Sequence, residues 1–176
     1  MNFRALGIPG AFAIEPQRIE DARGYFARTF CREEFAAQGL DPDLAQISTS
    51  FNRLRGTMRG MHYQAHPHAE AKVVRCTRGA IRDVIVDLRR GSPAFLEWAA
   101  LDLSEANGHA IYVPKGCAHG FLTLEDESEV LYQMSTPFHA ASASGVRWND
   151  PAFAIDWREP VRVISDRDRD YPDFVR

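Results

Sequence analysis

The sequence predicts an all-β fold with a minor α-helical part, of the β-sandwich or β-barrel class. Most segments with a clear signal are short runs rich in valine, isoleucine and leucine, and turn residues separate them at near-regular spacing. Helix signals are few. The 176 residues suit a single domain, 1–176, because nothing in the chain resembles a linker.

The first element in chain order is a short helix. Residues 31–38 (CREEFAAQ) are helix formers, and Gly39 follows them, which predicts a helix that ends there. The next clear signal is a strand at 80–88 (AIRDVIVDL), which stops at the turn-forming sequence RRGSP. A strand at 97–103 (EWAALDL) comes next and ends at the polar stretch SEANGH.

The second half of the chain continues this pattern. A strand at 109–113 leads into a tight turn, PKG, at 114–116. Two further strands, at 120–124 and 130–134, are joined through the polar sequence EDESE. The tail, 164–176, is charged but keeps two aromatic residues and a proline, so we expect it to pack against the body.

Composition argues against several classes of protein. A formal net charge of -3 argues against a dedicated nucleic-acid binder. We find no signal-peptide pattern and no run of about 18 apolar residues, so we expect no membrane partner. Cys31, Cys76 and Cys117 are odd in number and lack metal-type spacing, which predicts free thiols in a reducing compartment. We therefore expect a cytoplasmic location.

Four segments concentrate polar residues of the kinds that catalyse reactions or bind ligands. They are RGMHYQ, with Arg59 and His62; EAK, with Glu70 and Lys72; PKGCAHGF, with His119; and Tyr132 together with the tail ISDRDRD, which carries Asp166, Arg167 and Asp168. Arginines beside a histidine suit a phosphate-bearing substrate, because guanidinium groups bind phosphate oxygens in pairs. Taken singly, each residue has an ordinary explanation: a hydrogen-bonded surface histidine for His62, a solvated residue for Lys72, a core residue for Tyr132.

A metal site is an alternative interpretation. His66, His68 and Glu70, followed much later by His119, are similar to the two metal-binding motifs of the cupin superfamily. Imidazoles with a carboxylate could hold Fe, Mn or Ni, which would make the chain a metal-dependent oxygenase or isomerase. However, only Ala69 separates His68 from Glu70, where cupin sites have three or four residues, and the proline between His66 and His68 indicates a loop.

Taken in order, these segments and their flanks resemble the dTDP-4-dehydrorhamnose 3,5-epimerase family along nearly the whole chain. The matching stretches are DARGYF, GTMRGMHYQ, HAEAKVVRCTRGAIRDVIVDLRRGSPAF, VPKGCAHGFLTL, EVLYQ, GVRWNDPAFAIDW and ISDRD. The resemblance implies a cupin-type β jelly roll (a double-stranded β-helix), usually a homodimer, that needs no metal or other cofactor. It implies a nucleotide-sugar substrate, a 4-keto-6-deoxyhexose on a nucleoside diphosphate, in deoxysugar and polysaccharide biosynthesis.

The resemblance also implies four catalytic residues. His62 matches the base that removes the protons at C5 and C3, and Asp168 matches the carboxylate that orients its imidazole. Lys72 matches the residue beside the C4 oxygen, and Tyr132 the acid on the opposite face of the sugar. The chemistry asks for such groups, because a fixed cation stabilises an enolate as it forms and a histidine backed by a carboxylate titrates near pH 7. A third interpretation is a sugar-nucleotide-binding protein without catalytic activity. Such a protein needs no acid on the face of the sugar opposite the base.

The substrate-binding residues implied by the resemblance lie in several segments. They are Arg23, Phe26, Arg28, Ile47, Thr49, Arg59, His119, Phe138 and Arg167, with Arg23 and Phe26 lent across the dimer interface. Two stretches depart from the family pattern: Arg28 replaces an acid, and Ile47, Thr49 and Phe51 stand where the register from His62 places Q-x-N-x-S. A carboxylate accepts the N3–H of thymine, whereas Arg28 can only donate. The sequence therefore leaves the nucleobase open. Separately, it does not decide whether C3, C5 or both are inverted.

Overall fold

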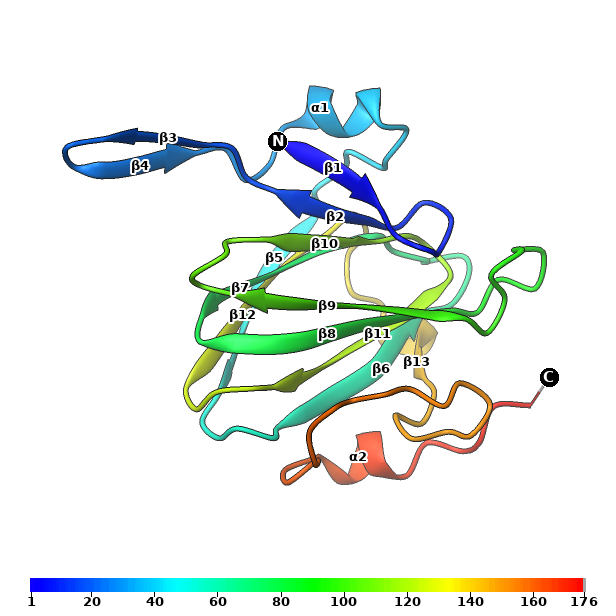
Figure 1. Ribbon diagram of the computed structural model, residues 1–176. Coiled ribbons are helices and arrows are strands. Elements are labelled where there is room, and N and C mark those ends of the chain that lie inside the picture. Colours follow the sequence, from blue (N-terminus) through cyan, green and yellow to red (C-terminus); the bar gives the residue numbers. More distant parts are fainter. Residues whose placement is uncertain (176) are drawn as a thin grey trace.

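The computed structural model describes residues 1–175, and two β-sheets packed face to face form its body (Figure 1). Sheet A consists, in spatial order, of β1 (Asn2–Ala5), β2 (Phe12–Glu15), β10 (Ala110–Val113), β7 (Lys72–Arg78), β12 (Ser128–Met134) and β5 (Gln46–Asn52). Sheet B consists of β13 (Ala143–Gly145), β6 (Met58–Gln64), β11 (Cys117–Thr123), β8 (Ala80–Asp87) and β9 (Trp98–Ser104). The remaining elements are β3 (Arg18–Asp21), β4 (Gly24–Ala27), α1 (Arg32–Ala37), α2 (Asp166–Arg169) and a 3-10 turn at Ala140–Ser142.

The chain passes repeatedly from one sheet to the other. β6 lies in sheet B, β7 in sheet A, β8 and β9 in sheet B, β10 in sheet A, β11 in sheet B and β12 in sheet A. Neighbouring strands run antiparallel, as β11 does beside β8 and β12 beside β7. Two antiparallel sheets built in this way form a jelly roll, which agrees with the predicted cupin-type β fold.

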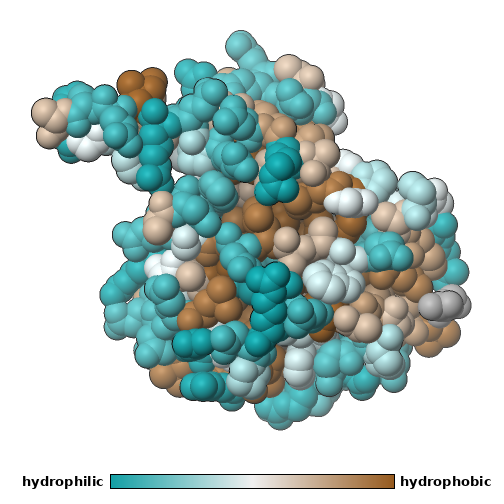
Figure 2. Space-filling view, in the orientation of Figure 1, coloured by the Kyte–Doolittle hydropathy of each residue, from teal (hydrophilic) through white to brown (hydrophobic). Residues whose placement is uncertain are grey.

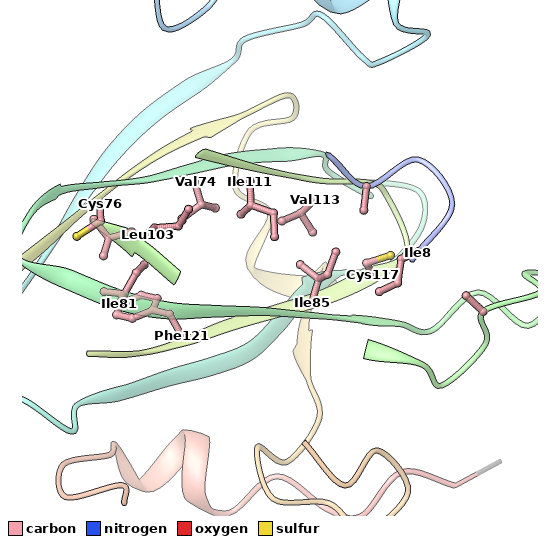
Figure 3. Close-up of a cluster of buried hydrophobic side chains, with 13 residues drawn as sticks. Ile8, Val74, Cys76, Ile81, Ile85, Leu103, Ile111, Val113, Cys117 and Phe121 are labelled. Atoms are coloured by element: carbon pink, nitrogen blue, oxygen red, sulfur yellow. The ribbon is translucent and has the colours of Figure 1, made fainter. Parts of the chain in front are cut away.

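The main core lies between the two sheets. Alternate side chains of each strand point inward, so Val74 and Ile111 from sheet A meet Ile85 and Phe121 from sheet B (Figure 3). All four side chains are fully buried. Each such burial contributes roughly 1.5–3 kcal/mol, so this core holds the two sheets in a defined relation to each other.

The C-terminal segment packs on the outer face of sheet B, as expected for the tail. Phe153 and Trp157 contact Met58 and Met61 of β6, and Trp157 Nε1–H donates to the carbonyl oxygen of Trp148 at 2.9 Å. α2 belongs to the same segment and lies beside β6 (Figure 1). This packing is what brings a charged helix from the end of the chain to the middle of a strand.

The N-terminal part adds a helix and a projecting hairpin. The predicted helix at 31–38 is confirmed as α1, whose Phe35 is fully buried against Phe3 and Tyr112 on the outer face of sheet A. β3 and β4 form a hairpin that projects from the body (Figure 1), which we call the arm, residues 18–27. Within residues 1–175, neither helix is long and apolar enough to cross a membrane.

The five strands predicted between residues 80 and 134 are confirmed as β8 to β12, with boundaries that move by at most three residues. The four N-terminal strands and β5 to β7 are additional to the prediction. β6 lacks an apolar alternation because its inward positions carry Arg59, His62 and Gln64. The strand signal is weakest where polar side chains replace the core.

Candidate active site

A histidine–aspartate pair joins sheet B to the C-terminal segment. His62, on β6, places its Nε2 2.7 Å from Oδ1 of Asp168, on α2. The side chain of Asp168 is 7% exposed and that of His62 is 39% exposed. The carboxylate is therefore covered while the imidazole remains accessible. The structure thus brings together two of the predicted catalytic residues from distant parts of the chain.

The backbone around α2 holds Asp168 in place. Ser165 caps the helix, because its hydroxyl accepts the Asp168 N–H at 3.2 Å. Just before the cap, the carbonyl oxygen of Val163 accepts the Met58 N–H at 2.8 Å, which ties the segment to the start of β6. The carboxylate is thus fixed to β6, the strand that carries the histidine.

Asp168 is held in its ionised form. Burial works to raise its pKa, but the hydrogen bond and charge of His62, the N–H of Gly60 and the charge of Arg167 outweigh burial and keep the pKa below its usual value. The Gly60 N–H donates to Asp168 Oδ2 at 3.2 Å. Only glycine fits at position 60, because φ is 139° and a Cβ would lie 2.5 Å from the Cα of Gly120.

Lys72 begins β7 and shares a pocket with His62. Its Nζ lies 3.0 Å from Oε1 of Glu70, and the two side chains are 12% and 9% exposed. This pocket, which we call the candidate pocket, has a volume of about 210 Å³ and is also lined by Phe138 and Arg167. The remaining lining residues are Tyr63, Gln64, Ala143 and Ser144. An imidazole and an ammonium group therefore face one cavity, together with two of the predicted substrate contacts.

Tyr132 lies on the inner face of sheet A and does not line the candidate pocket itself. Its ring makes an edge contact with His119 at a centroid distance of 6.2 Å and lies 6.5 Å from Phe121. Burial, with the negative charge of Asp83, raises the pKa of the Tyr132 phenol far above its usual value, and the charge of Arg59 offsets only part of this effect. The phenol therefore stays protonated and can act as an acid.

A second histidine–aspartate pair is buried between the sheets. His119 is the cross-strand neighbour of His62, and its Nε2 lies 2.8 Å from Oδ2 of Asp83 on β8. Burial raises the pKa of Asp83, and the charges of His119 and Lys72 lower it only in part. Its Oδ1 has no hydrogen-bond partner in the described chain, residues 1–175. Asp83 is not among the site residues predicted from the sequence, although a carboxylate inside the apolar run AIRDVIVDL is a usable signal.

Arg59 also faces the space between the sheets. It is paired with the inward-facing Phe121 in the register of β6 and β11, and its Nε–H donates to Oδ1 of Asn52 at 2.7 Å. The hydrogen bond leaves the terminal nitrogens of the guanidinium group available. The predicted contact of Arg59 with the diphosphate or sugar is thus compatible with its position.

Residues 5–175 match the sequence model of a family described as dTDP-4-dehydrorhamnose 3,5-epimerase. A relative of that name from Sinorhizobium fredii is 40% identical over 173 residues, which cover 98% of this chain and 89% of the relative. A dTDP-4-dehydrorhamnose 3-epimerase from Streptomyces niveus is 39% identical over 171 residues, 97% of this chain and 82% of the relative. The crystal structure of dTDP-4-dehydrorhamnose 3,5-epimerase from Bacillus anthracis, with TDP and PPi bound, has a TM-score of 0.94 and 36% identity, and the match covers 98% of this chain and 99% of that one. The chain belongs to the dTDP-4-dehydrorhamnose 3,5-epimerase family.

Membership of the dTDP-4-dehydrorhamnose 3,5-epimerase family confirms the resemblance found in the sequence, the isomerase class that it implied and the cupin-type β fold. The four catalytic roles, for His62, Lys72, Tyr132 and Asp168, stay predictions. The geometry supports them, because His62 and Lys72 line one pocket and Asp168 pairs with His62. Tyr132 lies on the inner face of sheet A, opposite the sheet that carries His62.

The register of β5 corrects two predicted substrate contacts of this epimerase-family chain. Residues paired directly across an antiparallel sheet share a face, and Tyr132 pairs with Ser48. Ile47 and Thr49 therefore point to the outer face of sheet A, away from the Tyr132 ring. The inward residues are Ser48 and Ser50, and the buried hydroxyl of Ser50 lies beside the Tyr132 phenol. Counting from the RGMHYQ motif predicts the wrong face, because a shift of one residue turns every side chain over.

The predicted nucleotide contacts on the arm and at Arg28, directly after it, do not line the candidate pocket of their own chain. Arg23 pairs with Asp21 at 2.5 Å, and Arg28 Nη1 donates to Glu34 Oε1 at 2.9 Å. Phe26 is 69% exposed. None of the three predicted residues lines the candidate pocket. Phe26 and Arg28 instead line a different pocket, with Met1 and Glu34.

The geometry contradicts the metal site proposed for His66, His68 and His119. His119 is buried between the sheets, whereas His68 stacks on His139 in a loop, with ring centroids 3.7 Å apart. His66 lines a different pocket, beside Arg89. Across residues 1–175, no group of three or more histidine, cysteine, aspartate or glutamate side chains is arranged to hold a metal ion.

Proposed function

We propose that this chain inverts one or both carbons beside the ketone of a dTDP-4-keto-6-deoxyhexose by removing a proton, forming an enolate and returning a proton to the opposite face. One observation carries the proposal: His62, backed by Asp168, and Lys72 line the same pocket. The names of the relatives and the TDP bound in the Bacillus structure favour the same class of substrate. The protein groups present supply each step, so the proposal requires no cofactor.

His62 acts as the base in this scheme. Its Nε2 is engaged with Asp168, which leaves the other ring nitrogen to accept a proton from carbon. The ionised carboxylate also stabilises the imidazolium that forms when the proton arrives. A proton beside a ketone is acidic enough for such a base only when the enolate is stabilised at the same time.

Lys72 supplies that stabilisation. Its ammonium group is largely buried, and Glu70 holds it by an ion pair at 3.0 Å. A donor fixed where negative charge develops is worth roughly 10²- to 10³-fold in rate, because it needs no reorganisation as the charge appears. We place Lys72 beside the C4 oxygen for this reason.

Tyr132 returns the proton. It belongs to β12 in sheet A, whereas His62 belongs to β6 in sheet B, and the two sheets face each other. A sugar held between the sheets therefore has the base on one face and the phenol on the other. Inversion of a carbon centre requires this arrangement, because the new proton must arrive opposite the face that lost the old one.

Incubation with dTDP-4-keto-6-deoxyglucose in deuterated water tests the proposal. We expect NMR to show deuterium at C3, C5 or both, and the ring coupling constants of the product to show which of these centres are inverted. His62→Ala should abolish incorporation, whereas His66→Ala, outside the candidate pocket, should behave as wild type. Tight binding of the sugar nucleotide by the wild-type protein without any incorporation would instead favour the binding protein without catalytic activity.

We propose further that Arg28 makes the chain accept nucleobases other than thymine. The family pattern has an acid at this position, and a guanidinium group cannot accept the thymine N3–H. Titration with dTDP, CDP and GDP tests this idea, with Arg28→Glu as the matched variant. Comparable affinities that become selective for dTDP in the variant are the expected result. If the wild-type protein binds dTDP clearly more tightly than CDP and GDP, the proposal is contradicted.

We propose that the chain forms a homodimer through the arm and the outer face of sheet A. Ile19 and Phe26 on the arm are 68% and 69% exposed. Figure 2 shows a small hydrophobic group on the projecting arm, which is otherwise mostly hydrophilic. Ile47 and Phe51 on the outer face of β5 are 56% and 44% exposed. Exposed apolar side chains gathered in this way favour aggregation of a monomer, and a second copy of the chain would bury both the arm and the outer face of β5.

The dimer and the shared site have separate tests. Light scattering should give twice the chain mass, and a monomer mass would contradict the dimer. If each arm serves the partner, His62→Ala and Phe26→Ala proteins should regain activity when mixed, because one site of the mixed dimer combines an intact base with an intact arm. Two dimeric variants that exchange subunits without regaining activity would overturn the shared site.

We propose a cytoplasmic location. Cys31, Cys76 and Cys117 are all free thiols. Unpaired thiols are typical of reducing compartments. Fractionation of the native host with an antibody tests this directly, and recovery from an oxidising compartment would contradict it.

A further inference from the structure

Tyr171 lies against the His62 ring, although neither the sequence motifs nor the proposed mechanism uses it. The two ring centroids are 6.2 Å apart and the ring planes meet at 65°, an edge-to-face contact. Tyr171 is half-buried and follows directly after α2, the helix that carries Asp168. The C-terminal segment therefore brings two different side chains to the same imidazole.

The strand paired with β6 at His62, β13, has a glycine at the position that the Tyr171 ring covers. Gly145, on β13, is the direct cross-strand partner of His62. A Cβ at position 145 would lie 2.4 Å from Cζ and 2.5 Å from Cε2 of Tyr171, and 2.7 Å from the carbonyl oxygen of Met61. The missing side chain at 145 is what allows the tyrosine ring to lie on β13 next to the imidazole.

The hydroxyl end of Tyr171 contacts a second residue of the site. Arg167 Nε–H donates to the Tyr171 hydroxyl oxygen at 3.1 Å. Arg167 lines the candidate pocket together with His62. The ring and the hydroxyl of one side chain therefore touch two different groups, one expected to do the chemistry and one expected to bind the substrate.

We propose that Tyr171 is a positioning residue of the epimerase site, whose ring holds the His62 imidazole and whose hydroxyl holds Arg167 at the pocket. This inference rests on the proposed function, with His62 as the base. A single hydrogen bond to Asp168 fixes one atom of the imidazole but leaves the ring free to tilt about that bond. Contact with the tyrosine ring restricts the tilt. A misplacement of about 1 Å can cost on the order of 10²-fold in rate, so the restriction is large enough to matter.

Steady-state kinetics of deuterium exchange separates the two contacts. Tyr171→Ala removes both and should lower kcat by about 10- to 100-fold. Tyr171→Phe keeps the ring, so its kcat should stay within about twofold of wild type, while the lost hydrogen bond to Arg167 raises KM by about threefold.

Phe174→Ala is the matched control, because it weakens the docking of the same tail away from the pocket. Phe174 packs against Phe153, at a centroid distance of 5.6 Å, and does not line the candidate pocket. Its removal should lower the thermal midpoint and leave kcat within about twofold of wild type in samples that circular dichroism shows to be folded.

The outcomes separate this inference from the function on which it rests. A wild-type protein that exchanges no deuterium would overturn the proposed function and the inference with it. If the wild type is active, the inference alone is overturned by any of three results. These are a Tyr171→Ala kcat near that of wild type, a Tyr171→Phe kcat as low as that of Tyr171→Ala, or an equal loss in folded Phe174→Ala.

Discussion

Replacing Asp168 with asparagine removes one negative charge from the pair with His62 and changes the volume very little. In the structure, Oδ1 of Asp168 lies 2.7 Å from His62 Nε2, and Oδ2 accepts the Gly60 N–H at 3.2 Å. A carboxylate serves both partners, whereas an amide has only one acceptor oxygen. If that oxygen stays with Gly60, the amide N–H₂ faces His62 and moves the imidazole proton to the nitrogen that must act as the base.

The magnitude follows from these contacts. Loss of a buried hydrogen bond to a charged acceptor costs roughly 1.5–3 kcal/mol. Forcing the wrong tautomer in a histidine–aspartate pair of a hydrolase lowers kcat by about 10⁴-fold. We therefore expect Asp168→Asn to lower the kcat of deuterium exchange by about 10²- to 10⁴-fold, with a much smaller change in KM, because Asp168 does not line the pocket.

The same substitution changes how stability depends on pH. The pKa of Asp168 is lower in the folded protein than its usual value, so the carboxylate stabilises the fold above that usual value, about 3.9. This contribution is lost as the pH falls through the lowered pKa. Below about pH 4, the free energy of unfolding should therefore fall more steeply for wild type than for Asp168→Asn.

The assay is deuterium incorporation at saturating substrate, followed by NMR. Asp166→Asn is the matched control, because Asp166 lies on the same helix with its side chain 87% exposed and pairs with Arg169 at the surface. It should exchange deuterium as wild type does. An Asp168→Asn kcat within about threefold of wild type would refute the reasoning.

Three further predictions concern other parts of the molecule. Tyr132→Phe should slow inversion more than deuterium exchange, because exchange needs no proton donor on the face opposite the base; NMR measures both, and equal loss of the two would contradict the assignment. Gly60→Ala should lower the free energy of unfolding in urea by roughly 2–4 kcal/mol, since its Cβ would meet Gly120 at 2.5 Å; an unchanged midpoint would argue against that close approach. Burial raises the pKa of Cys117 to about 12, so neutral iodoacetamide should label the half-buried Cys31 first; equal labelling rates by mass spectrometry would contradict this.

The sequence predicted the parts of the fold that local chemistry determines. The run AIRDVIVDL lies in β8 and is almost wholly buried, so its branched apolar side chains give a clear strand signal. The helix before Gly39 follows from helix formers and a stop residue. The tail packs because Phe174 contributes apolar surface to the outer face of sheet B. Each of these signals lies within a few residues of the element that it predicts.

Contacts between residues far apart in the sequence are harder to predict from it. The pairing of His62 with Asp168 was predicted only because the order of motifs resembled a family; nothing local joins a strand to a helix so far along the chain. The inward residues of β5 were misplaced because the side-chain period of a strand is two, and an error of one residue exchanges Ile47 for Ser48.

Partners of the predicted residues were also missed. Asp83 was detectable in principle, because a carboxylate within an apolar strand must find a partner, and His119 is that partner. Tyr171 was not detectable in this way. Its contact with His62 depends on Gly145, and the sequence alone does not place these three residues together.

A crystal structure of the His62→Asn protein with dTDP-4-keto-6-deoxyglucose bound tests the central claim most directly. We predict that the C4 oxygen lies within hydrogen-bond distance, about 3 Å, of Lys72 Nζ, with position 62 on one face of the sugar and the Tyr132 hydroxyl on the other. A sugar bound with its C4 oxygen remote from Lys72, or with position 62 and Tyr132 on the same face, would contradict the account.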